Sequence, residues 1–128
     1  MKYVCLAYEE EKKLNTLTKS EWDLLRKDTL AYVEKMQRNG TLISAEPLQS
    51  VHNATTVRVR NDKISVIDGP FAETKETLGG FFLIEAADLD EAIQIAAKWP
   101  SAQLGSIEVR PIDSELRKDG RYETLSET

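Results

Sequence analysis

Hydrophobic residues in this chain recur with two periods, which together predict a mixed α and β domain. Between positions 22 and 36 they follow helical spacing, with Trp22, Leu25, Tyr32 and Met36 on one stripe. A capping box at 18–21 begins this helix, and the Asn-Gly pair at 39–40 ends it. A second helix begins at a similar capping sequence at 88–91 and ends at the Trp-Pro pair at 99–100.

Strand-like segments surround the two helices, and the polar segment 9–16 is expected to be a loop. The predicted strands cover residues 1–8, 41–45, 55–60, 63–68, 80–86 and 106–112. This order lacks a regular βαβ alternation, so it favours an α+β fold with both helices on one face of an antiparallel sheet. The runs at 4–7 and 81–84 are apolar at successive positions, which indicates burial on both faces of their strands. Because two helices cover only one face, we expect a homodimer.

The strands at 55–60 and 63–68 are predicted to form a hairpin around Asn61-Asp62, two residue types that tolerate a positive φ. A two-residue turn there places Val59 opposite Ile64 and, further along, position 57 opposite position 66. These cross-strand pairs give the hairpin one apolar face.

Asp68 closes the second strand of this hairpin and shares the alternation of its apolar face. A carboxylate at the edge of such a face either gains hydrogen bonds or has its pKa raised by desolvation. The first outcome would position a ligand or the backbone, and the second would make a general acid or base. Aspartate before Gly-Pro is also a common turn builder, so a purely structural role stays open.

The segment 69–80 follows as a candidate lid over a pocket. Ordering it on ligand binding would cost about 1 kcal/mol per residue, more than the roughly 8 kcal/mol of micromolar affinity. We therefore expect it to be ordered already, anchored by Phe71 and Leu78. The glycine pair Gly79-Gly80 is expected to permit close backbone approach, because no phosphate-binding motif follows it.

Composition restricts the function classes. The chain has 128 residues, of which 41% are hydrophobic and 30% charged, and it reads as one domain. A net charge of -5 opposes binding to nucleic acid. Neither a membrane-spanning run nor a signal-peptide layout is evident, so a cytoplasmic location is expected. One cysteine (Cys5, expected to be buried and inert) and one histidine (His52) support no metal site, and no cofactor is indicated.

The sequence Asp68-Gly69-Pro70-Phe71, followed by charged residues at 73, 75 and 76, resembles the DGPF-domain branch of the YCII-related family. The resemblance covers about residues 1–113 and leaves a polar tail at 114–128. It implies a ferredoxin-like fold that pairs into a dimeric α/β barrel, with a cleft near Asp68. YCII-type relatives resemble small enzymes built on a His–Asp pair, and the corresponding helix position here is Thr29. Threonine does not shuttle protons near neutral pH, so this departure puts the family's chemistry in doubt.

Two functions remain open, beside a purely structural module. The first is an enzyme acting on a small organic molecule, with Asp68 as acid or base. The residues expected to contact the ligand are His52, Thr29, Tyr32, Arg58 and Phe71. The second is a non-catalytic regulatory dimer, because the DGPF branch is associated with alternative sigma factors. That reading predicts a sigma factor as partner and no direct contact with nucleic acid.

Overall fold

The structure, a computed structural model, describes residues 1–113. The predicted polar tail at 114–128 lies outside the described residues. Four strands form an antiparallel sheet in the order β2-β5-β1-β6, and β3 and β4 form a separate two-stranded sheet. Along the chain the elements are β1 (Lys2–Glu9), α1 (Glu11–Leu14), α2 (Lys19–Arg38), β2 (Leu42–Pro47), the 3-10 turn η1 (Val51–Asn53), β3 (Thr55–Arg60), β4 (Lys63–Asp68), β5 (Thr77–Glu85), α3 (Leu89–Ala97), the 3-10 turn η2 (Pro100–Gln103) and β6 (Gly105–Pro111).

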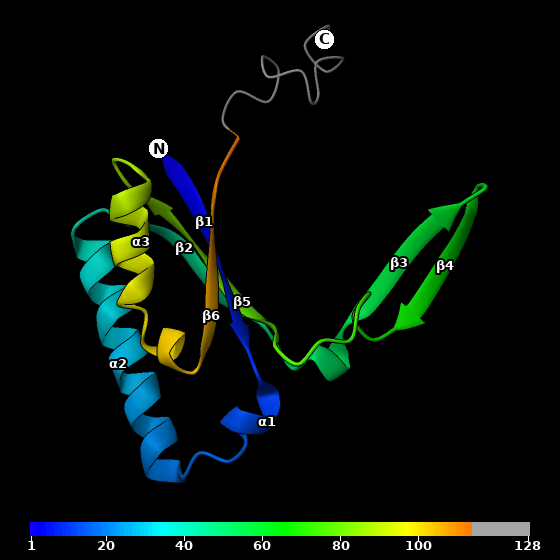
Figure 1. The fold of residues 1–128 in the computed structure, drawn as a ribbon, viewed down its shortest axis with the longest axis horizontal. Helices are drawn as coiled ribbons and strands as arrows, with labels where there is room; N and C mark the ends of the chain where they lie inside the picture. Colours follow the sequence, from blue (N-terminus) through cyan, green and yellow to red (C-terminus); the bar gives the residue numbers. More distant parts are fainter. Residues whose placement is uncertain (114–128) are drawn as a thin grey trace, which may run out of the picture.

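Both long helices lie on the same side of the four-stranded sheet (Figure 1). With the β3–β4 hairpin set aside, the chain runs β1, α2, β2, β5, α3, β6, which is the ferredoxin-like βαββαβ order. The hairpin is inserted between β2 and β5, the two strands that follow each other directly in this order. The α+β, ferredoxin-like prediction is therefore confirmed.

The helix ends show why the sequence folds this way. The Thr18 hydroxyl accepts a hydrogen bond from the Glu21 amide, and the Glu21 carboxylate accepts one from the Thr18 amide, so the predicted capping box is present. The hydrogen bond from the Thr18 amide is the main cause that lowers the pKa of the Glu21 carboxyl, and the Thr18 side chain lowers it further. At the other end Gly40 takes a φ of +77°, the left-handed conformation expected there. The Asp88 carboxylate caps α3 by accepting from the Glu91 amide.

The sequence predicted that segment 9–16 is a loop. The structure corrects this prediction, because the segment contains the short helix α1. The Glu11 carboxylate ties this turn to η1, accepting from the Ser50 hydroxyl at 3.0 Å and the Val51 amide at 2.8 Å. β5 begins at Thr77, three residues before its predicted start, because Thr77 and Leu78 pair with the end of β1. Both corrections concern partners that are distant in sequence, which a local pattern does not reveal.

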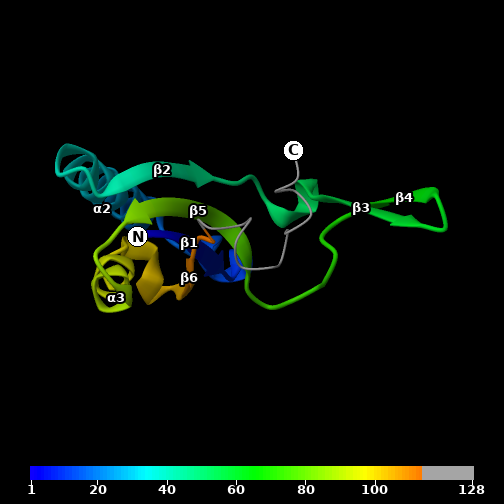
Figure 2. The ribbon, with the colours of Figure 1, turned by 90° about the horizontal axis from the view of Figure 1, so that it is seen from above.

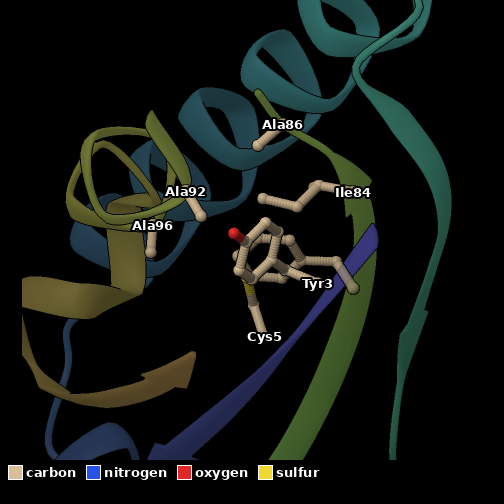
Figure 3. Close-up of a cluster of buried hydrophobic side chains, with 7 residues drawn as sticks. Tyr3, Cys5, Ile84, Ala86, Ala92 and Ala96 are labelled. Atoms are coloured by element: carbon tan, nitrogen blue, oxygen red, sulfur yellow. The ribbon is translucent and has the colours of Figure 1, made fainter. Parts of the chain in front are cut away.

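The core lies between the sheet and the two helices. Its buried members are Tyr3 and Cys5 of β1, Phe82 and Ile84 of β5, Ala86 directly after β5, and Ala92 and Ala96 of α3 (Figure 3). The small alanine side chains let α3 approach the sheet closely. The Phe82 ring stacks on Trp99 with a centroid distance of 4.0 Å. Burial raises the pKa of the Cys5 thiol to about 11, so Cys5 is an inert core residue, as expected.

The second face of the sheet has an apolar centre. Val4 pairs with Leu83, and Leu6 pairs with Phe81, so these four side chains project opposite to the buried Tyr3, Cys5, Phe82 and Ile84. They are half-buried in the single chain. The helices α2 and α3 both lie on the other side (Figure 2). The predicted two-sided apolar character of β1 and β5 is therefore present; below, this second face is called the open face.

The β3–β4 hairpin has the predicted register. Thr55 is opposite Asp68, and Val59 is opposite Ile64, around a turn in which Asn61 and Asp62 both have positive φ. Its apolar face, however, is exposed, because the hairpin projects away from the sheet (Figure 1). Phe71 is 79% exposed and does not anchor the following loop in the single chain, contrary to the prediction.

Candidate functional site

A cavity of about 550 Å³ lies between α2 and the sheet. The helix contributes mostly apolar side chains, and the sheet contributes the ends of β1, β2 and β5. Its lining includes Trp22, Leu25, Arg26, Thr29, Leu30 and Val33 of α2, Ala7 and Glu9 of β1, Gly79, Gly80 and Phe82 of β5, and Trp99. A volume of this size accommodates a small organic molecule.

Glu9 is the acid that the β1 strand directs into this cavity. It follows Tyr3, Cys5 and Ala7 in the alternation that faces the helices, and it is the last residue of the strand. Partial burial is the main cause that raises the pKa of its carboxyl, and the negative charge of Glu11 raises it further. A carboxyl with a raised pKa beside an apolar cavity is a candidate acid or base.

The predicted close approach at Gly79-Gly80 is confirmed, and its reason is specific. A Cβ at Gly79 would lie 2.6 Å from Oε2 of Glu9, and one at Gly80 would lie 2.9 Å from the Glu46 carbonyl oxygen. The β1–β5 pairing shifts by one residue here, between Ala7 and Tyr8. The irregularity and the absence of a side chain at Gly79 make room for the Glu9 carboxylate, and the absence of one at Gly80 lets the β2 backbone approach.

A second hollow of about 440 Å³ adjoins the first and shares Glu9, Leu14, Trp22 and Gly79 with it. His52 lines this hollow from the η1 turn. Glu9 therefore lies where two hollows meet, one bounded by α2 and the other by the segment that carries the only histidine of the chain. The Glu11 hydrogen bonds to residues 50 and 51 hold that segment in place.

The residues that the sequence singled out lie in different parts of the fold. Thr29 lines the α2 cavity, and its hydroxyl donates to the Leu25 carbonyl at 2.7 Å, so toward the cavity it offers acceptor capacity. His52 lines the neighbouring hollow. Asp68 and Arg58 lie on the exposed hairpin and line none of these hollows.

Phe71 borders a further hollow of about 680 Å³ at the base of the hairpin, together with Tyr8 and Thr55. Tyr32 lies outside the three hollows. Its hydroxyl donates to the Ile95 carbonyl at 2.8 Å, and its ring meets Trp99 edge-on at 6.1 Å. Burial is the first cause that raises the pKa of Tyr32, and the nearby Cys5 is the second. The single chain thus does not bring Asp68 together with Thr29 or His52.

Sequence reasoning missed Glu9, although one signal pointed to it. The alternation Tyr3, Cys5, Ala7 continues to Glu9 with the same phase, which predicts an inward carboxylate if the strand extends that far. The predicted strand ends at residue 8, one position before Glu9, so the pattern did not place this carboxylate on the inward face. The register shift that opens the space beside Glu9 is a tertiary feature.

Within residues 1–113, no group of three or more His, Cys, Asp or Glu side chains is arranged to hold a metal ion. No helix of the same part of the chain is long and apolar enough to cross a membrane. The ionisable residues that line the cavity are Glu9, Arg26 and Glu46.

Comparison with known proteins now places this fold. The model of the YCII-related domain matches residues 1–115. The chain belongs to the YCII-related family. An uncharacterised protein of Rhizobium meliloti (strain 1021) is 39% identical over 114 residues, which is 88% of this chain and 92% of that protein. This YCII-related chain is thus matched along nearly its whole described length.

A solved structure shares the fold of this YCII-related protein. It is 5-chloro-2-hydroxyhydroquinone dehydrochlorinase (TftG) from Burkholderia phenoliruptrix AC1100, in complex with 2,5-dihydroxybenzoquinone. The two superpose with a TM-score of 0.56 at 17% sequence identity, covering 93% of this chain and all of the other. At that identity the likeness establishes the architecture alone.

Proposed function

We propose that this protein is a homodimeric enzyme that acts on a small, largely apolar organic molecule by proton transfer in the cavity between α2 and the sheet. One observation carries the proposal: a carboxyl group with a raised pKa, Glu9, lies beside an apolar cavity of about 550 Å³. Most surface carboxyls are ionised at neutral pH and fully hydrated. This one is partly desolvated and has space in front of it.

The cavity lining indicates the class of substrate. Trp22, Leu25 and Leu30 offer apolar and aromatic surface, and Arg26 offers a cation at the rim. A hydroxylated ring fits this combination, because its face packs on aromatic side chains and a phenolate or enolate oxygen pairs with a guanidinium. That the structural neighbour is solved with 2,5-dihydroxybenzoquinone supports this substrate class.

In the proposed mechanism Glu9 accepts a proton from the bound molecule and returns it to another position. The apolar lining partly desolvates the carboxylate, which raises the pKa of the carboxyl above its usual value. Thr29 contributes a hydroxyl acceptor that orients the substrate, the place at which the family resemblance implied a histidine. His52, in the adjoining hollow, is a second proton-transfer candidate.

Asp68 was the first candidate acid or base from the sequence. In the single chain it is exposed and lines none of the hollows that contain Glu9. We therefore assign the proton transfer to Glu9 and leave Asp68 the role of closing the hairpin, where Thr55 is its cross-strand partner.

The homodimer in this proposal forms through the open face of the sheet. Val4, Leu6, Phe81 and Leu83 form an apolar centre on that face, and a second copy with the same centre would bury it reciprocally. Two such sheets packed together would make the dimeric α/β barrel that the family resemblance implies.

A partner protein is the second candidate function, and the exposed β3–β4 hairpin favours it. A two-stranded ribbon with an exposed apolar face is a common docking element for other proteins. The sigma factor expected from the family resemblance would be such a partner. On this reading Glu9 would be dispensable and the hairpin essential.

Substitution of Glu9 tests the enzyme proposal. Turnover of a panel of hydroxylated benzoquinones and catechols should fall at least about 100-fold in Glu9→Gln, because general acid–base catalysis contributes on that order. Glu10→Gln is the matched control, since Glu10 is the adjacent acid and its side chain makes no capping hydrogen bond to α1. An activity that survives in Glu9→Gln and disappears in Asp68→Asn would reject the assignment.

A further inference from the structure

The β3–β4 hairpin, Thr55–Asp68, is called the arm here. Its strands pair only with each other, and its base is fixed by two hydrogen bonds: the Gly69 amide donates to the Ala54 carbonyl at 2.7 Å, and the Thr56 hydroxyl donates to the Gly69 carbonyl at 2.8 Å. The arm projects from the side of the sheet opposite to α2 and α3 (Figures 1 and 2). It therefore lies on the same side as the open face.

The two faces of the arm differ in character. On one face Val57, Val59, Ile64 and Val66 are between 56% and 73% exposed. The other face carries the cations Arg58, Arg60 and Lys63, which alternate with the apolar residues along the same strands. An isolated two-stranded ribbon is marginally stable in water, and an exposed apolar edge pair promotes aggregation. The arm thus has the composition of an element that is covered in the functional protein.

We infer that the apolar face of the arm docks on a second copy of this chain, so that the two arms of a two-fold dimer each clasp the other protomer beside the paired open faces. This inference rests on the homodimer of the proposed function and adds a second, independent contact to it. The arm, together with the paired sheets, then determines the affinity of the dimer.

Each chain presents two uncovered apolar surfaces on the same side, which favours a second copy as the partner. The open face and the arm's apolar face are both built from strands of this chain, and a two-fold axis that pairs the open faces also places each arm against the other copy. An isologous contact of this kind covers both surfaces at once and leaves no unpaired apolar ribbon on either protomer.

Charge provides the second argument. The arm carries three cations against the two carboxylates of Asp62 and Asp68, so its net charge is +1, whereas the whole chain carries -5. On the open face, Glu108 of β6 forms an ion pair with Arg110 of the same strand, so the acid that a basic arm would meet is Glu46 of β2, opposite Phe81. A basic arm reaching an acidic neighbour reduces the repulsion between two negatively charged copies.

The test compares three lysine variants with the full-length wild-type chain by sedimentation equilibrium. Val59→Lys combined with Ile64→Lys places charges on the arm's apolar face, and Ser65→Lys adds one on its opposite face as the matched control. Leu83→Lys disrupts the open face. We expect a wild-type dimer whose dissociation constant rises at least about 100-fold in the Val59/Ile64 variant and is unchanged in Ser65→Lys, because burying an unpaired charge is costly.

A second readout distinguishes a second copy from any other occupant. In a mixed sample of labelled and unlabelled chains, isotope-filtered contacts should appear between the Val59 and Ile64 methyl groups and the unlabelled copy. A dimer that tolerates the Val59/Ile64 variant but is lost in Leu83→Lys would overturn the arm inference and keep the homodimer. A monomeric wild type would overturn both, while leaving the Glu9 activity test unaffected.

Discussion

Glu9 illustrates how one carboxyl acquires a special environment from ordinary residues. It belongs to a strand whose preceding inward positions, Tyr3, Cys5 and Ala7, are all buried. The absent side chain of Gly79 leaves space beside its Oε2 atom. Desolvation then raises the pKa of its carboxyl without any special catalytic partner. The environment of this carboxyl depends on strand phase and on a glycine, which are visible in the sequence, and on the shifted β1–β5 pairing, which is not.

The raised pKa predicts a pH dependence of stability. Because the folded chain holds the Glu9 proton more tightly than the unfolded chain, the stability contributed by protonated Glu9 is fully present below the unfolded pKa and is lost as pH rises through the folded pKa. Glu9→Gln should therefore stabilise the protein relative to wild type at pH 7.5 and lose this advantage near pH 4. Urea unfolding at both pH values measures the difference, and Glu10→Gln serves as control. An advantage that grows toward low pH would contradict the assignment.

Residue-scale prediction from the sequence succeeded where the determinants are local. The Thr18–Glu21 capping box, the left-handed Gly40 and the Asn61-Asp62 turn are all as predicted, because each depends on bonds or dihedrals within a few residues. Glu9 was not found, because its importance depends on where β1 ends and on a register shift against β5.

At the scale of elements, the Tyr32 side chain connects α2 to α3. The Tyr32 hydroxyl donates to the Ile95 carbonyl, and its ring contacts Trp99. Tyr32→Phe should lower the free energy of unfolding by about 1 kcal/mol, the usual net value of such a bond. Urea denaturation measures it, with Tyr8→Phe as a control expected within about 0.5 kcal/mol of wild type. Equal stability of both variants would show that this connection is immaterial.

The β3–β4 hairpin shows what hydrophobic periodicity predicts about an element and what it does not. Alternation correctly predicted its register and its single apolar face, since cross-strand pairing follows from a two-residue turn. It did not predict that this face is exposed, because periodicity reports which residues share a face and not what covers that face. For the same reason Phe71 was expected to anchor a loop and is instead exposed.

On the scale of the whole molecule, the apolar pattern of β1 and β5 predicted a sheet with two hydrophobic faces, and the fold has them. The α+β class followed from the strand and helix signals, whereas the ferredoxin-like fold was implied by the family resemblance. Which surface of the molecule holds a small ligand did not follow, because the α2 cavity is formed by residues of three strands and a helix that meet only in the folded chain.

The most direct test of the central claim is an NMR titration of the wild-type protein with 2,5-dihydroxybenzoquinone and related hydroxylated rings. The chain has two tryptophans, Trp22 and Trp99, and both line the α2 cavity. We predict that shifts concentrate on their two indole resonances and on the Gly79 and Gly80 amides. Shifts confined to the hairpin-base hollow around Tyr8, or none with any ring of the panel, would contradict the proposed site.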